Sequence, residues 1–373
     1  MVDGPPQARW NNALVQRDSR VLLAIADSSR SGGPEHVLTL AGELTAAGWT
    51  VLVACPPGQL ASRCQAVGVP VSTLSMSGRG WATAPVELRQ LARRWQAGLV
   101  HSHGLRAGAL VRRARPRAPQ VHTHHLDGWF TASSLRIAAH RYELRALGRS
   151  AQLQIAVSNA VAGFLTETGG QDTHRVRVVP NGIQPLPVLR RSAPSGRRVG
   201  VLARLTQSKG VDIAILALAT PAGRHLTLNV GGAGPEMAAL VDLAYTVGVS
   251  DRVNFWGEVT DREGFFAACD LAWVPSRAEP FGLSACEAMS SGLPVVASRV
   301  GGLSEILDPP RAGLVVGPAN PAALASVSSG LLTDHPRYAE LSAAGADRIR
   351  RRFSASRMGA LTRGVYREVI GVD

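Results

Sequence analysis

The sequence predicts an α/β protein made of two doubly wound, Rossmann-like domains that face each other across a cleft. Its 373 residues are enough for two domains of ordinary size. Short apolar runs alternate with helical stretches, which is the pattern of a parallel sheet with right-handed crossovers. This alternation occurs in two blocks, and a stretch rich in Pro, Ser and Arg near residues 184–196 separates them.

Thirteen short runs are the predicted strands. Most of them are continuously apolar, as strands covered on both faces are. The predicted strands are 21–26, 50–55, 69–74, 99–104, 120–125, 152–158 and 176–180 in the first block, then 198–204, 225–231, 252–257, 271–275, 293–298 and 313–317 in the second. Helices are predicted between them, for example at 34–47, 86–96, 235–247 and 320–332.

The domain boundaries follow from this pattern. We expect a disordered tail over 1–18, an N-terminal domain over 19–184, a linker over 185–197, a C-terminal domain over 198–353, and a last helix over 354–373 that crosses back to the first domain. Ligands of open α/β sheets bind beyond the carboxyl ends of the strands. The functional residues should therefore follow strands and face the cleft.

Composition narrows the class of partner. The chain has 40 Lys and Arg against 27 Asp and Glu, a net charge of +13, which suits an anionic partner. Nucleic acid is not expected, because no zinc finger, RNP motif or helix-turn-helix signature is present. The apolar runs are too short to cross a bilayer, there is no secretory signal, and the four cysteines show no C-x-x-C spacing. We therefore expect a cytoplasmic protein.

Two glycine-rich segments follow predicted strands and precede predicted helices. Gly32-Gly33 comes after the first strand, and Gly231-Gly232-Ala233-Gly234 comes after the strand at 225–231. Glycines let the backbone approach a phosphate or a nucleoside closely. Ordinary tight turns between strand and helix are the alternative at both places.

Arg204 and Lys209 lie five residues apart after the strand at 198–204. Two cations beside the N-terminus of a helix can hold a diphosphate. A solvated loop is the alternative. Lys209 is the single lysine of an otherwise arginine-based chain, and a compact ammonium differs from a planar guanidinium at a phosphate site, which favours the functional interpretation.

Histidines gather at the ends of two neighbouring strands. They are His101 and His103 on one strand and the run His122-Thr123-His124-His125 on the next. Imidazoles are good metal ligands, but no acidic or thiol partner other than Asp127 lies at a useful spacing. We therefore expect no metal site. A histidine facing the cleft would donate a hydrogen bond to substrate, and at least His101 and His122 would be structural.

The segment from Glu279 to Glu287 follows the strand at 271–275. Ser284 and Glu287 have the spacing of a capping box, which predicts a helix that begins at Ser284. Glu279 lies in the preceding loop, whose Gly282 and backbone N–H groups can face a ligand. This arrangement suits a nucleotide sugar, with Glu279 at the hexose and Glu287 at the ribose.

These motifs together resemble the retaining glycosyltransferases of family 4, the group 1 glycosyltransferases with the GT-B fold, over about residues 20–370. The matching motifs are E-x7-E (Glu279, Glu287), the basic pair (Arg204, Lys209), the GG loop (Gly32-Gly33), P-N-G-I (180–183), the glycine turn (231–235), F-x-G (255–257) and V-G-G-x-x-E (300–305). Two positions depart from the family pattern, because Ala203 replaces a usual Gly and Gln184 replaces a frequent acid.

The resemblance implies a set of site residues. The catalytic ones are His125, Arg204, Lys209 and Glu279, and the donor-binding ones are Gly32, Gly33, Asn181, Gly232, Gly234, Phe281, Gly282, Leu283, Ser284 and Glu287. The T-x-H histidine of the family is matched by His125, and His124 is a rival because the run of histidines is ambiguous by one residue. No metal and no cofactor are implied.

The implied reaction moves a hexose from a nucleoside-diphosphate sugar to a hydroxyl group with retention of configuration. A UDP-sugar is favoured and a GDP-sugar is the other option. The resemblance further implies that the N-terminal domain (19–184) binds the acceptor and the C-terminal domain (198–353) binds the nucleotide sugar. The acceptor is a sugar, a lipid-linked molecule or a natural product. The alternatives are a nucleotide-sugar epimerase of the same architecture and a non-catalytic basic binding protein.

Arginines crowd two regions of the first block, at 106, 112, 113, 115 and 117 and at 136, 141, 145 and 149. They could dock an anionic membrane that carries a lipid-linked acceptor. Solvated arginines in an arginine-rich chain are the alternative.

Overall fold

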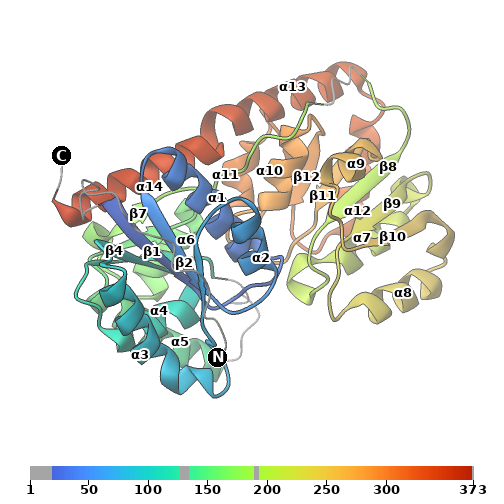
Figure 1. Ribbon diagram of the computed structural model, residues 1–373. Coiled ribbons are helices and arrows are strands. Elements are labelled where there is room, and N and C mark those ends of the chain that lie inside the picture. The colour runs from blue at the N-terminus through green and yellow to red at the C-terminus, as the bar shows by residue number, and fades with distance from the viewer. Residues whose placement is uncertain (1–18, 127–133, 189–192, 372–373) are drawn as a thin grey trace, which may run out of the picture.

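Two parallel sheets form the scaffold of the protein (Figure 1). The computed structural model describes residues 19–126, 134–188 and 193–371, without the side chains of residues 134–140. The seven-stranded sheet has the order β3-β2-β1-β4-β5-β6-β7, and the six-stranded sheet has the order β10-β9-β8-β11-β12-β13. The predicted fold class is therefore confirmed, and each of the thirteen predicted strands overlaps an observed one.

The sheets are built from short strands. They are β1 (Arg20–Ile25), β2 (Thr50–Cys55), β3 (Val71–Thr73), β4 (Leu99–His103), β5 (Gln120–His124), β6 (Leu153–Ala156), β7 (Val176–Val178), β8 (Arg198–Leu202), β9 (Thr227–Gly231), β10 (Val253–Gly257), β11 (Leu271–Val274), β12 (Val295–Ser298) and β13 (Leu314–Val316).

Helices cover both sheets. They are α1 (Gly32–Ala46), α2 (Gln59–Ala66), α3 (Gly80–Arg94), α4 (Gly104–Ala114), α5 (Ser134–Ser150), α6 (Asn159–Gly163), α7 (Val211–Leu218), α8 (Met237–Thr246), α9 (Arg262–Ala267), α10 (Leu283–Ser290), α11 (Leu303–Leu307), α12 (Pro321–Leu331), α13 (His335–Arg352) and α14 (Ala355–Ile370). None of the helices in the described part of the chain is both long and apolar enough to span a bilayer.

The strand β1 illustrates why the apolar runs form central strands. Successive side chains of a strand point to opposite faces of the sheet. Val21, Leu23 and Ile25 pack into a core with α1, α2 and α14, whereas Leu22 and Ala24 pack into a core with α3 and α4. Because both faces are covered, the sequence of β1 is continuously apolar rather than alternating.

The C-terminal helix α14 belongs to the core of the first sheet. Its Met358, Val365 and Tyr366 are buried among the apolar side chains of β1, β2 and α1, and Figure 1 shows the helix lying beside α1. Two backbone hydrogen bonds hold the chain where it enters α14. The Ile183 N–H donates to the Phe353 carbonyl (2.9 Å), and the Ala355 N–H donates to the Ile183 carbonyl (2.8 Å). The expected tail over 1–18 and part of the expected linker, 189–192, lie outside the described residues.

Candidate active site

A cleft of about 770 Å³ lies between the two halves of the molecule, beyond the carboxyl ends of β1, β8 and β11. All predicted site residues except Gly234 line it. They are Gly32, Gly33, His125, Asn181, Arg204, Lys209, Gly232, Glu279, Phe281, Gly282, Leu283, Ser284 and Glu287. Residues that are far apart in the sequence meet there because each follows a parallel strand, and the ends of parallel strands share one edge of a sheet.

Lys209 and Glu279 form an ion pair inside this cleft. The ammonium of Lys209 donates to Oε2 of Glu279 at 2.8 Å, and the Ser276 hydroxyl donates to the same oxygen at 3.2 Å. The side chains are only 19% and 9% exposed. An unpaired charge buried to this degree would be costly, so each residue compensates the burial of the other.

Arg204 lies on the same loop as Lys209 and is exposed at the cleft wall. Asp27, at the end of β1, lies within electrostatic range of it. Burial opposes ionisation of Asp27, but hydrogen bonds from Ser29 and Ser31, together with the charge of Arg204, leave its pKa lowered. The sequence analysis does not identify Asp27, because a single acid after a strand has no distinctive pattern.

Glu287 pairs with Arg262, the first residue of α9. Arg262 also lies 3.5 Å from Glu35 on α1, and Arg63 on α2 binds both oxygens of Glu35, at 2.6 and 3.0 Å. Charges of alternating sign therefore run from α10 across the cleft to α2. Burial lowers the pKa of Arg262, and the neighbouring arginines add to this effect. No sequence motif marks Arg262 as a site residue.

The predicted capping box does not form. The helix α10 begins at Leu283, one residue earlier than expected, and no side chain in the described part of the chain caps it. Gly282 enters the helix with φ at +124°, and a Cβ there would lie 2.7 Å from a methyl of Leu303. Ser284 is consequently the second helical residue, beyond the capping position, and the Glu287 carboxylate is held by Arg262 instead.

The structure separates the two candidate histidines. His125 lines the cleft, whereas His124 is buried and its Nε2 lies 2.8 Å from the Gln154 side chain. Burial lowers the pKa of His125 to about 3 and that of His124 to about 4. Both rings are therefore neutral at pH 7. Asp127, the acid named in the sequence analysis, lies outside the described residues.

The glycines differ in what they do. Gly232 has φ at +130°, and a Cβ there would lie 1.9 Å from the Ala203 carbonyl oxygen, so a side chain is excluded. Gly32 and Gly33 open α1, and a Cβ on either would make only ordinary contacts. Gly234 packs against the backbone of Leu205 rather than facing the cleft. It shapes the loop and is not placed to touch a ligand.

Comparison with known proteins identifies the family of this chain. A model of the group 1 glycosyl transferases matches residues 196–334, and a model of Glycosyltransferase Family 4 matches residues 30–185. A D-inositol 3-phosphate glycosyltransferase of Acidothermus cellulolyticus is 31% identical over 304 residues, which cover 73% of this chain and 67% of that protein. This chain belongs to the group 1, family 4 glycosyltransferases.

Further proteins are similar to this chain. The glycogen synthase of Mycobacterium tuberculosis is 29% identical over 79% of this chain and 74% of its own length. Matches to curated relatives cover from 53% to 83% of the relatives' own length. Among solved structures, that of Anabaena Alr3699/HepE in complex with UDP-glucose superposes with a TM-score of 0.81 at 22% identity, over 94% of this chain and 99% of that one. The fold is therefore GT-B, and the protein is a retaining-family hexosyltransferase.

Proposed function

We propose that the protein transfers a hexose from a nucleoside-diphosphate sugar, with UDP as the favoured nucleotide, to a hydroxyl acceptor with retention of configuration. The observation that carries the proposal is the Lys209–Glu279 pair, which lies beside Arg204 in a cleft that both sheets line. Arg204 and Lys209, two cations suited to a diphosphate, therefore share one cavity with the buried carboxylate of Glu279, which suits a sugar.

The residues would divide the chemistry as follows. As the bond from the anomeric carbon to the diphosphate breaks, negative charge develops on the leaving group, and Arg204, Lys209 and the N-terminus of α10 stabilise it. The acceptor oxygen attacks from the same face, and its proton passes to a phosphate oxygen of the leaving group. Glu279 and His125 orient the hexose, and Glu287 accepts hydrogen bonds from the ribose.

The preference for UDP rests on the family and on one structural relative. The Anabaena protein was crystallised with UDP, with UDP and glucose, and with UDP-glucose, and its fold matches this chain. GDP-sugars are the second candidate donors.

A binding screen tests the donor first. Purified protein is heated with UDP, GDP, ADP or dTDP in buffer without magnesium. A ligand at 100 times its Kd stabilises the folded state by about 2.7 kcal/mol, so we expect a clear rise in Tm with UDP. A rise with none of the four would overturn the proposed donor site and favour a basic binding protein.

A turnover assay then separates transferase from epimerase. UDP-glucose is incubated with and without a panel of sugar, lipid-linked and natural-product acceptors. We expect release of UDP together with a glycosylated acceptor. Conversion of the nucleotide sugar to an isomer in the absence of any acceptor would identify an epimerase instead.

We further propose that an anionic membrane carries the acceptor. A hollow of about 550 Å³ on the first half is lined by Arg89, Arg112, Arg113 and Arg115. The Arg113 guanidinium lies 5.4 Å above the ring of Trp81, which is 39% exposed. Basic residues contribute about 1 kcal/mol each near an anionic surface, and interfacial tryptophan adds apolar contact.

Sedimentation with vesicles tests this docking. The protein should bind vesicles of phosphatidylglycerol but not of phosphatidylcholine, and added salt should weaken the binding. The double variant Arg113→Glu/Arg115→Glu should bind at least about ten-fold more weakly, whereas Arg224→Glu, an exposed arginine of the other half, should bind as the native protein does. Equal binding by both variants would exclude this surface.

A further inference from the structure

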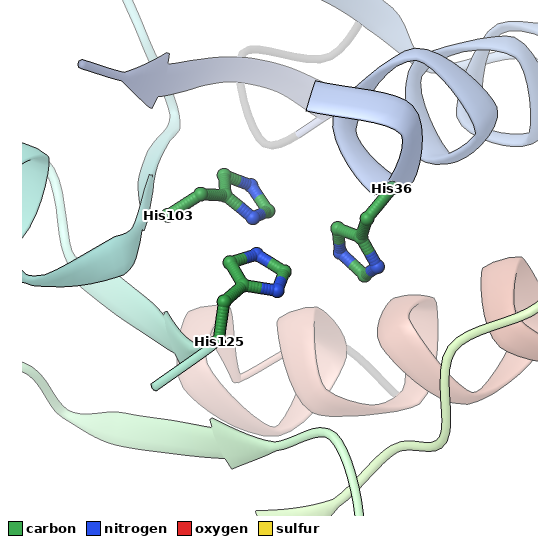
Figure 2. Close-up of side chains that lie close together, drawn as sticks. All are labelled: His36, His103 and His125. Atoms are coloured by element: carbon green, nitrogen blue, oxygen red, sulfur yellow. The ribbon is translucent and has the colours of Figure 1, made fainter. Parts of the chain in front are cut away.

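Three histidines from separate elements converge behind the cleft wall. His36 comes from α1, His103 from the end of β4, and His125 from the chain just after β5. Figure 2 shows the three rings facing one another. One nitrogen of each ring lies within 4.8 Å of the corresponding nitrogens of the other two. The rings of His36 and His125 meet edge to face with centroids 4.9 Å apart, and those of His103 and His125 are stacked at 5.8 Å.

Five of the six ring nitrogens of this cluster lack a hydrogen-bond partner among the described residues, although the Asn181 side chain lies near His36. Among the described residues, neither ring nitrogen of His36 or His103 has a hydrogen-bond partner, and Nε2 of His125 has none either. The neighbouring His101 differs, since its nitrogens lie 2.6 Å from the Tyr366 hydroxyl and 2.7 Å from that of Thr123. Buried polar atoms are usually satisfied, and leaving one unsatisfied costs about 1–3 kcal/mol. A bound group that is not part of the polypeptide would remove this cost by binding these nitrogens.

The chemistry of the three rings suits a Lewis-acidic ligand. Each imidazole carries a nitrogen lone pair, and metal ions bind neutral imidazole nitrogen. The three side chains are buried and come from separate elements, so they surround one point without a competing carboxylate of the cluster itself.

We propose that His36, His103 and His125 bind one transition-metal dication of the Zn²⁺ type. Zinc–nitrogen bonds are about 2.0–2.1 Å, so the ligand nitrogens of a tetrahedral site lie roughly 3.4 Å apart. The observed nitrogens all lie within 4.8 Å of one another, so binding requires them to approach by at most about 1.4 Å. A site made of three imidazoles without a carboxylate selects Zn²⁺, Co²⁺, Ni²⁺ or Cu²⁺ over Mg²⁺.

The bound ion would have a definite consequence for the cleft. His125 lines the cleft and also contributes to the cluster. An ion held by His36 and His103 would therefore fix the ring of His125 from behind. The ion is distinct from any metal at the donor diphosphate, where Arg204 and Lys209 supply the positive charge. No metal site is expected from the sequence, because no acidic or thiol residue other than Asp127 lies at a useful spacing from the histidines at the strand ends. The sequence pattern does not include His36, since it is distant from them in the sequence.

Cobalt is the probe for this site, because its visible absorption reports coordination. Protein freed of metal by a chelator is titrated with Co²⁺. We expect one ion per chain with intense visible bands of a tetrahedral site, displacement of Co²⁺ by Zn²⁺, and no displacement by Mg²⁺. Loss of a single supporting residue can weaken a metal site by about 10–100-fold, so His36→Gln and His103→Gln should each bind at least roughly 100-fold more weakly.

His225→Gln is the matched control, since His225 is exposed and lies in the other half of the protein. It should bind Co²⁺ as the native protein does. Circular dichroism and Tm establish that the variants are folded. Should His36→Gln or His103→Gln fail to fold, X-ray absorption of the zinc-loaded native protein decides, and three imidazole ligands are expected. Weak octahedral binding, binding retained by His103→Gln, or fewer than three imidazoles would each overturn the site and leave a buried water as the partner of these rings.

Discussion

Lys209 and Glu279 are coupled by their burial, and this coupling predicts how substitutions will behave. Replacing either one leaves the other as an uncompensated charge in the cleft. We expect Lys209→Met and Glu279→Gln each to destabilise the fold by about 1–3 kcal/mol, and the double variant to lose less than the sum. Urea unfolding of the four proteins measures this difference. Glu340→Gln breaks a pair that is 60% exposed at the glutamate and should change stability by less than about 1 kcal/mol.

The same two variants should differ in function. Glu279→Gln should lower kcat about 10²–10³-fold while UDP still binds, because its proposed contact is with the reacting sugar. Lys209→Met should weaken UDP binding itself, because its proposed contact is with the diphosphate. Calorimetric titration with UDP and initial rates with UDP-glucose distinguish the two effects. Native turnover by Glu279→Gln would show that this carboxylate is not at the reacting centre.

The buried histidines make stability depend on pH. Burial lowers the pKa of His36, His101, His103, His122, His124 and His125. Between the unfolded value of about 6.5 and these lowered values, the unfolded chain binds more protons than the folded one. Stability is therefore full above pH 6.5 and falls as the pH drops from 6.5 toward 4. Each such histidine adds roughly 1.4 kcal/mol per pH unit to the slope.

His124→Gln tests this slope. The substituted amide can still bond Gln154, so the slope below pH 6.5 should decrease by about one histidine's share. Urea unfolding in the presence of EDTA, at pH values from 4 to 8, provides the measurement. Asp270 affects stability in a lower pH range than the histidines do. Hydrogen bonds from Arg198 and Ser195 outweigh burial and lower its pKa to about 2. Its contribution to the free energy of unfolding is therefore lost only below about pH 4. An unchanged slope in His124→Gln would contradict the assignment.

The sequence predicts which side chains line the cleft, but it does not predict which of them pair with one another. The position of Lys209 or Glu279 after a strand follows from local pattern. Their ion pair, and the pairing of Glu287 with Arg262, depend on loops from different strands meeting in space. No spacing in the sequence reports such contacts, and His36 was missed for the same reason.

Elements were predictable where their signal is local. The apolar strands were placed to within a few residues because burial on both faces requires continuous apolar runs. The start of α3 was not, since the predicted helix begins at residue 86 whereas the observed helix begins at Gly80 and contains Pro85. Backbone hydrogen bonds from each of residues 80–82 to the residue three positions earlier form its first turn, and the sequence pattern does not reveal them.

Gly301 positions the loop that carries Glu279. Its φ is +48°, and a Cβ there would lie 1.9 Å from the Glu279 carbonyl oxygen, which accepts a bond from the Gly302 N–H at 3.0 Å. Gly301→Ala must displace this loop. We expect a loss of about 1–3 kcal/mol in stability and, since a displacement of about 1 Å can cost 10²-fold in rate, a large fall in kcat.

Gly317→Ala is the control for this substitution, because Gly317 is exposed and a Cβ there meets nothing within 4 Å. Its stability and kcat should stay close to the native values. If Gly301→Ala kept native kcat while losing stability, the loop would tolerate displacement and Glu279 would not need its observed position.

At the scale of the whole molecule, the two halves are joined by polar contacts beside the cleft and by an apolar cluster. Val161 and Leu165 of the first half pack in one cluster with Phe281 and Phe353, and the Ser158 hydroxyl donates to the Pro280 carbonyl at 2.7 Å. The two doubly wound domains were predictable from the two blocks of alternation, and the resemblance to family 4 implied their GT-B arrangement. This junction was not, because its contacts join residues more than a hundred positions apart.

Glu305 is the strongest polar link across that junction. Its carboxylate accepts bonds from the Asn159 backbone and side chain at 2.9 and 2.8 Å and from the Ala160 N–H at 2.9 Å, at the N-terminus of α6, where negative charge is favoured. Hydrogen bonds to charged groups contribute about 1.5–3 kcal/mol each in favourable cases. Glu305→Ala should therefore loosen the two halves, with a larger radius of gyration in X-ray scattering and a higher KM for the donor.

Glu258 makes a contrasting link, since it pairs with Arg30 at 3.7 Å and its side chain is 49% exposed. Such pairs are screened by solvent and contribute little, so Glu258→Ala should leave both the radius of gyration and KM close to native. Saturating UDP-glucose should restore much of the compactness of Glu305→Ala, because a ligand held by both walls of the cleft favours the closed arrangement. Equal effects of the two substitutions would mean that the apolar cluster around Phe281, and not the capped helix, holds the halves together.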